Sequence, residues 1–174
     1  HDIFNSPEAA PQWLTRVQNS GNSQGTRIEP TADGYAVAGY TMAPAPNEAA
    51  IVIRNDNKAI YKGIRDVSTN ADDDTDGILD GVELWVNMMD FILTAGGTGG
   101  LDNILVYADD AFHTAPNTYV DQALDYLGLP YTAHYDGDFA GFTTDLTTNG
   151  PWDLVIFGHE NYGTGSAVFD ALNT

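Results

Sequence analysis

The chain has 174 residues, of which 43% are hydrophobic and 11% aromatic, so it has enough apolar side chains to fold around a packed core. Six basic residues against 25 acidic ones give a formal net charge of -19, which repels phosphate backbones and anionic membrane surfaces and argues against nucleic acid as a partner. Cysteine is absent, which excludes a disulfide framework and a thiolate nucleophile. Divalent cations are expected partners, because they relieve the self-repulsion of such an acidic chain.

The location predicted from composition is extracellular or at the cell surface. No apolar run approaches the roughly 18 residues that cross a bilayer, and the first residues lack a signal-peptide pattern, so no membrane insertion is expected. Because the first residue is His, we expect a processed or excised form of a longer product. High acidity, scarce Lys and abundant Asn, Thr and Gly favour secretion.

Residues 1–66 form the first predicted domain, a β-rich segment. Short strand patterns separated by turn residues indicate an antiparallel meander. The predicted strands are WLTRVQ, TRIEP, YAVAGYTM, AAIVIR and KAIYKGI. The stretch RIEPTADGYAVAGYT resembles one repeat of secreted bacterial β-propeller proteins, with a looser match over residues 13–62. A single such repeat would have two exposed sheet edges that something must cover.

Residues 67–101 form the second predicted domain, with an acidic loop, a helix from Val82 to about Leu93 and a glycine-rich linker. Apolar residues occupy most of the helix circumference, which favours a core helix over a partner-binding one. One narrow polar stripe interrupts them, at helical spacing. Its members are Glu83, Asn87, Asp90 and Thr94.

The acidic loop reads DDDTDGILDGVE and matches the EF-hand calcium pattern D-x-[DN]-x-[DN]-G-x5-E. Alternate carboxylates can surround one cation, Gly77 allows the sharp bend, Ile78 offers a backbone carbonyl, and the last Glu closes the sphere. The predicted metal ligands are Asp72, Asp74, Asp76, Ile78, Asp80 and Glu83. The alternative is a solvated acidic turn, since Asp and Gly are common in turns. A turn without a cation would bring mutually repelling carboxylates together with no favourable interaction to offset the repulsion. Ca²⁺ is therefore the predicted cofactor.

The residues before the loop, IYKGIRDVSTNA, read as strand and loop rather than as an entering helix. The site therefore resembles the single calcium loops of dockerin and thrombospondin type 3 modules more than a paired EF-hand. This resemblance implies a structural calcium ion in an exported protein, bound with an affinity of about 10⁻⁴ to 10⁻³ M.

Residues 102–174 form the third predicted domain, in which strands and helices alternate. ILVY and LVIF are continuous apolar runs, as in a parallel sheet covered by helices on both faces. Asn117 is a candidate cap and Gly128 a candidate end for the first helix. The segment resembles the opening half of the flavodoxin-like and glutamine-amidotransferase-like folds, which implies a βαβαβα doubly wound half-domain with strand order 2-1-3. The fold class is therefore mixed α/β.

Residues 59–66 and 80–91 are in turn similar to the closing strand and helix of amidotransferase-like domains in exported bacterial proteins. The end of one such fold would then precede the start of another. Either a circular permutation joins both parts within one chain, or neighbouring copies complete each other. The second alternative predicts a homo-oligomer, or filaments, formed by strand-edge pairing.

An alternative site lies where parallel strands end, at the switch point of a doubly wound sheet. Its candidate residues are Asp109, Asp110, His113, His159, Glu160 and Asn161. They could bind a metal or perform acid–base chemistry in a metal-dependent hydrolase or ligand-binding domain, or form a hydrogen-bonded loop cluster. The nucleophilic Cys of an amidotransferase is missing, and Gly158 and His159 stand where a response-regulator receiver has its phosphorylated Asp. We therefore expect no catalytic residues and a calcium-binding, non-enzymatic structural or assembly module.

Overall fold

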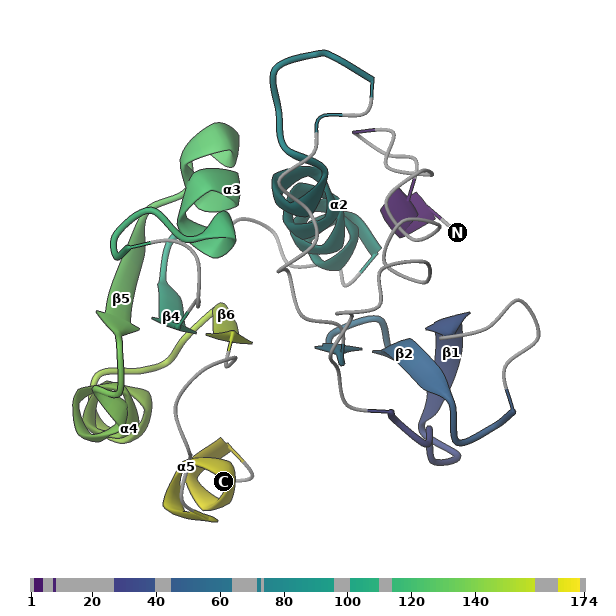
Figure 1. Cartoon of the computed structure of the whole chain (residues 1–174). Coiled ribbons are helices and arrows are strands. Elements are labelled where there is room, and N and C mark those ends of the chain that lie inside the picture. The colour runs from purple at the N-terminus through teal and green to yellow at the C-terminus, as the bar shows by residue number, and fades with distance from the viewer. Residues whose placement is uncertain are drawn as a thin grey trace. The chain divides into compact units, whose positions relative to one another are not determined.

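The computed structural model describes residues 2–4, 8, 27–39, 45–63, 72, 74–95, 101–109, 114–158 and 166–172 (Figure 1). The chain divides into two compact units, residues 1–98 and 99–174. The first contains a three-stranded antiparallel sheet and the second a three-stranded parallel sheet, each accompanied by helices. The predicted mixed α/β class is confirmed.

The antiparallel sheet has the order β1 (Gly34–Gly39), β2 (Ala49–Arg54) and β3 (Ile60–Lys62). The central strand β2 is an apolar run whose first five residues are buried, as expected for the middle of a sheet. Of the described residues 27–30 in the predicted strand TRIEP, only Ile28 pairs, through an isolated bridge to Ala49. The predicted strand WLTRVQ lies outside the described residues.

Helix α2 (Asp80–Ala95) packs on this sheet and extends two residues further at each end than predicted. Leu84 and Met88, one turn apart, lie in a buried cluster with Ile51 and Ile53 of β2. Burial of each such side chain stabilises the fold by about 1.5–3 kcal/mol. The short helix η1 (Asp2–Phe4) adds Ile3 and Phe4 to the same cluster. The apolar face of α2 therefore holds both the sheet and the first residues of the chain.

The parallel sheet of the second unit has the order β5 (Tyr131–Tyr135), β4 (Ile104–Ala108) and β6 (Leu154–Gly158). All five residues of β4 are buried. Because side chains alternate along a strand, both faces of β4 are covered. Tyr107 on one face stacks with Phe157 of β6 at a ring-centroid distance of 5.1 Å.

Helix α4 (Phe139–Thr148) packs on that aromatic face. Its Phe139 stacks on Tyr107 at 4.6 Å, and its Phe142 is fully buried in the same cluster. Helix α5 (Ser166–Leu172) contacts α4 and contributes Val168. These aromatic contacts fix α4 against β4, and the neighbouring strand β5 then lies beside α4 with a charged cluster between them.

Helix α3 (Tyr119–Leu127) begins one residue later than predicted, because Thr118 rather than Asn117 is its cap. The Thr118 hydroxyl accepts a hydrogen bond from the Asp121 backbone, and the Asp121 carboxylate accepts one from the Thr118 backbone at 2.8 Å. This reciprocal capping box satisfies two N–H groups that the helix start leaves open. Gly128 ends the helix as predicted, with a left-handed φ of 65°.

Candidate metal centre

The acidic loop folds around its own carboxylates. The backbone N–H of Asp76 donates to Asp72 Oδ1 at 3.0 Å and to Asp74 Oδ1 at 3.3 Å. Gly77 donates to Asp72 Oδ2 at 3.0 Å, and Ile78 donates to Asp76 Oδ1 at 2.8 Å. Gly77 has a φ of +97°, which a residue with a side chain rarely adopts. The glycine thus allows the bend that turns three carboxylates toward one point.

Asp72, Asp74 and Asp76 form a group that could hold a metal ion. Each offers one carboxylate oxygen, and these oxygens all lie within 4.8 Å of one another. Oxygens bound to one Ca²⁺ at 2.3–2.6 Å can be no more than about 5 Å apart. The observed spacing therefore fits a shared cation.

Glu83 approaches from the first turn of α2 and has an unusual environment for a carboxylate. It is only 1% exposed, and its Oε1 has no hydrogen-bond partner among the described residues. Burial, together with the charges of Asp74 and Asp76, raises the pKa of Glu83 to about 8. A buried carboxylate oxygen without a partner is costly, so this position favours either a proton or a cation.

Glu83 belongs to a second group that could hold a metal ion, and this group includes a residue that the sequence motif did not reveal. Its members are Glu8, Asp76 and Glu83, each with a ligand atom within 4.8 Å of the others. Asp76 is common to both groups. Glu8 lies far outside the motif in the sequence, and no local pattern marks it.

The other predicted ligands occupy different positions. Ile78 lies in the loop with its N–H bonded to Asp76, as described above. Asp80 is 3% exposed at the start of α2, and among the described residues it falls in neither metal-holding group. The non-ligand residue Thr75 is exposed, with a φ of 64°.

The alternative site is represented by a single described residue, Asp109, directly after β4. It is 3% exposed, its Oδ2 accepts a hydrogen bond from the Tyr107 hydroxyl at 2.9 Å, and its N–H donates to the Gly158 carbonyl at 2.9 Å. These contacts give Asp109 a structural role in joining β4 and β6. The remaining candidates lie outside the described residues: Asp110, His113, His159, Glu160 and Asn161.

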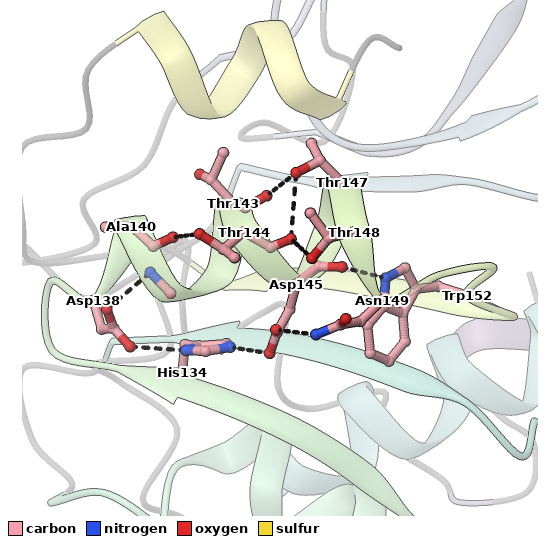
Figure 2. Close-up of polar contacts among 11 residues, drawn as sticks. His134, Asp138, Ala140, Thr143, Thr144, Asp145, Thr147, Thr148, Asn149 and Trp152 are labelled. Carbon is pink, nitrogen blue, oxygen red and sulfur yellow. Dashed lines mark hydrogen bonds and ion pairs between the residues drawn. The ribbon is translucent and has the colours of Figure 1, made fainter.

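A second charged cluster, which the sequence did not predict, lies between β5 and α4 (Figure 2). The ring of His134 stands between two carboxylates, with Nδ1 2.8 Å from Asp138 Oδ2 and Nε2 2.8 Å from Asp145 Oδ2. A histidine can donate from both ring nitrogens only as the imidazolium. We call these three residues the His134 clamp.

Neighbouring residues hold both carboxylates of the His134 clamp in place. Asp138 caps α4 and accepts a hydrogen bond from the Gly141 backbone at 3.0 Å. Asn149 donates to Asp145 Oδ1 at 2.6 Å (Figure 2). Both ring nitrogens are engaged, so the clamp serves to join β5 to α4 rather than to bind a substrate.

Comparison with protein families, curated proteins and solved structures found no match to this chain. Among the described helices, none has both the length and the apolar character needed to cross a bilayer.

Proposed function

We propose that this chain is a calcium-binding, non-enzymatic structural module of an extracellular or cell-surface protein, in which the acidic loop binds one Ca²⁺. The observation that carries this proposal is the buried Glu83, whose Oε1 has no hydrogen-bond partner in the described part of the chain. It lies beside Asp76, which in turn lies beside Asp72 and Asp74. A ligand set made only of carboxylate and carbonyl oxygens suits a hard divalent cation, and the EF-hand spacing favours Ca²⁺.

Electrostatics supports a bound cation over a bare acidic turn. Two carboxylates separated by 4.8 Å repel by about 1 kcal/mol where water screens them and by about 3 kcal/mol near a protein surface. Several such pairs share Asp76, so the repulsion accumulates at one point. A divalent ion replaces it with attraction, and its binding free energy then stabilises the folded loop.

The finer fold of the second unit is part of the same proposal. We infer a doubly wound half-domain of the flavodoxin-like or amidotransferase-like kind, with strand order 2-1-3. The order β5, β4, β6 and the coverage of both faces of β4 support this inference.

Calcium titration by isothermal calorimetry, after removal of metal with a chelator, tests the proposed function. We expect a dissociation constant of about 10⁻⁴ to 10⁻³ M. At 10 mM calcium and a constant of about 10⁻⁴ M, binding would stabilise the fold by about 2.7 kcal/mol. Glu83→Gln should abolish the heat of calcium binding, whereas Glu29→Gln, which removes an exposed charge, should leave it unchanged. Equal thermal melting with millimolar calcium and with a chelator would contradict the proposal.

Self-association is a second proposal, motivated by the sheet edges. Within the described residues, β5 and β6 each pair only with β4. The open edge of a strand offers backbone groups to another copy. Sedimentation velocity with and without calcium tests this. A monomer in both conditions would remove self-association while leaving calcium binding intact.

A further inference from the structure

Glu8 is held against α2 by a buried side chain of the predicted polar stripe. Asn87 is fully buried, and its Oδ1 accepts a hydrogen bond from the Glu8 backbone N–H at 2.9 Å. Its Nδ2 donates to the Glu8 carbonyl at 2.8 Å. Two bonds to one residue fix both the position and the direction of the backbone there.

Two residues before Glu8, Ile3 and Phe4, are held by the apolar face of the same helix. Ile3 is fully buried and Phe4 is 8% exposed, and both lie in the cluster that contains Leu84 and Met88. We call residues 2–4 and 8 the N-terminal anchor. It therefore contacts α2 at two places, one apolar and one polar.

The position of Asn87 explains why the side chain of Glu8 reaches the acidic loop. Asn87 follows Glu83 by four residues, so the two side chains lie one above the other on the same helix face. The residue that Asn87 holds is thereby brought beside Glu83. The result is the group of Glu8, Asp76 and Glu83, whose ligand atoms lie within 4.8 Å of one another.

We propose that Glu8 is an additional ligand of the calcium ion, and that ion binding fastens the N-terminal anchor to the acidic loop and α2. This inference rests on the proposed calcium function. Its basis beyond the acidic cluster is Glu83, 1% exposed, with Oε1 unpartnered among the described residues. Ca²⁺ takes six to eight oxygens, so the sphere has room for one carboxylate beyond those of the loop. The site then joins three parts of the chain: the anchor, the loop and the helix.

The variant Glu8→Gln tests the proposal cleanly, because Asn87 bonds to the backbone of Glu8 and not to its carboxylate. Glu29→Gln is the matched control, since it makes the same change of charge at an exposed position. Because calcium affinity follows the number of charged ligands, we expect Glu8→Gln to weaken binding about tenfold in calorimetry. The control should change it less than about twofold.

Hydrogen exchange measured by mass spectrometry adds a readout that a general charge effect would not alter. In the unchanged 174-residue chain, calcium should slow exchange both in peptides covering residues 2–8 and in peptides covering residues 74–95. In Glu8→Gln, saturating calcium should still protect residues 74–95 but should no longer protect residues 2–8.

The possible failures are distinct. If Glu8→Gln binds calcium as tightly as the control while Glu83→Gln abolishes binding, the calcium site stands and the role of Glu8 is overturned. Calcium protection of residues 2–8 that persists in Glu8→Gln would also overturn it. If the unchanged chain binds no calcium, the proposed function fails, and this inference fails with it.

Discussion

The His134 clamp should stabilise the second unit only while its histidine is charged. Burial by itself would lower the pKa of His134, but the hydrogen bonds to Asp138 and Asp145 outweigh it and raise the pKa above its ordinary value of 6.5. The hydrogen bond from His134 lowers the pKa of Asp138 below 3.8. The folded state therefore favours an imidazolium between two carboxylates.

The variant Asp145→Asn removes one charge from the His134 clamp and keeps the side-chain shape. A hydrogen bond to a charged group contributes about 1.5–3 kcal/mol, and Asp145 is only 21% exposed, so solvent screens it little. We expect Asp145→Asn to lower the free energy of unfolding by about 2 kcal/mol at pH 5.5. Asp138 is 54% exposed, and Asn is also a good cap, so Asp138→Asn should cost less than about 1 kcal/mol.

The direction of the pH dependence follows from the raised pKa of His134 and the lowered pKa of Asp138. A raised histidine pKa contributes stability that is present below pH 6.5 and is lost as the pH rises through the folded-state value. A lowered aspartate pKa contributes stability that is present above pH 3.8 and is lost as the pH falls through the folded-state value. The clamp should therefore contribute most between these two values. At pH 9 the difference between the unchanged chain and Asp145→Asn should shrink.

Urea unfolding followed by tryptophan fluorescence measures this effect. Trp13 and Trp85 are replaced by Phe in every protein compared, so Trp152 is the one remaining tryptophan and supplies the fluorescence signal. Its indole donates to the Asp145 carbonyl at 3.1 Å, so it reports on the second unit. Asp125→Asn, an exposed change on α3, is the control and should have little effect. If Asp145→Asn lowers the free energy of unfolding by the same amount at pH 5.5 and at pH 9, the argument that His134 must be charged is refuted.

Two further substitutions test the contacts that position these sites. Asn87→Ala should lower the free energy of unfolding of the first unit by about 2 kcal/mol, because it removes both hydrogen bonds to Glu8. A loss below about 0.5 kcal/mol in urea unfolding would contradict that contact. Gly141→Ala should destabilise the second unit, although Ala ordinarily stabilises a helix interior by about 1 kcal/mol over Gly. The added Cβ would lie 2.7 Å from His134 Nδ1 and 2.8 Å from Asp138 Oδ1, so a higher melting temperature would count against the clamp.

Local patterns predicted the elements well because they depend on neighbours in the sequence. The apolar run AAIVIR predicted the buried strand β2, and YTAHY predicted β5 with the observed bounds. The acidic loop was found for the same reason, since the spacing of its carboxylates is a one-dimensional signal. The sequence also holds the signal for the observed cap of α3, because Asp121 stands three residues after Thr118 and the pair matches a capping box.

Contacts between distant residues could not be predicted in this way. Glu8 and Asn87 are separated by 79 positions, and only the folded chain brings them together. The sequence places Asn87 on the polar stripe of α2 but does not identify the residue that it bonds. Asp145 likewise meets His134 because aromatic packing sets α4 against β4, the neighbour of β5, and this cause lies outside both residues.

Helix α2 carries two pairs of residues that are offset by one position, Glu83 with Asn87 and Leu84 with Met88. One residue corresponds to a rotation of about 100° around a helix axis. If α2 were turned by that amount in one direction, the leucine and methionine would face the acids, and if it were turned in the other direction, the acid and amide would enter the apolar cluster. Two different kinds of contact, apolar packing and polar bonding, therefore fix the same rotational position of the helix.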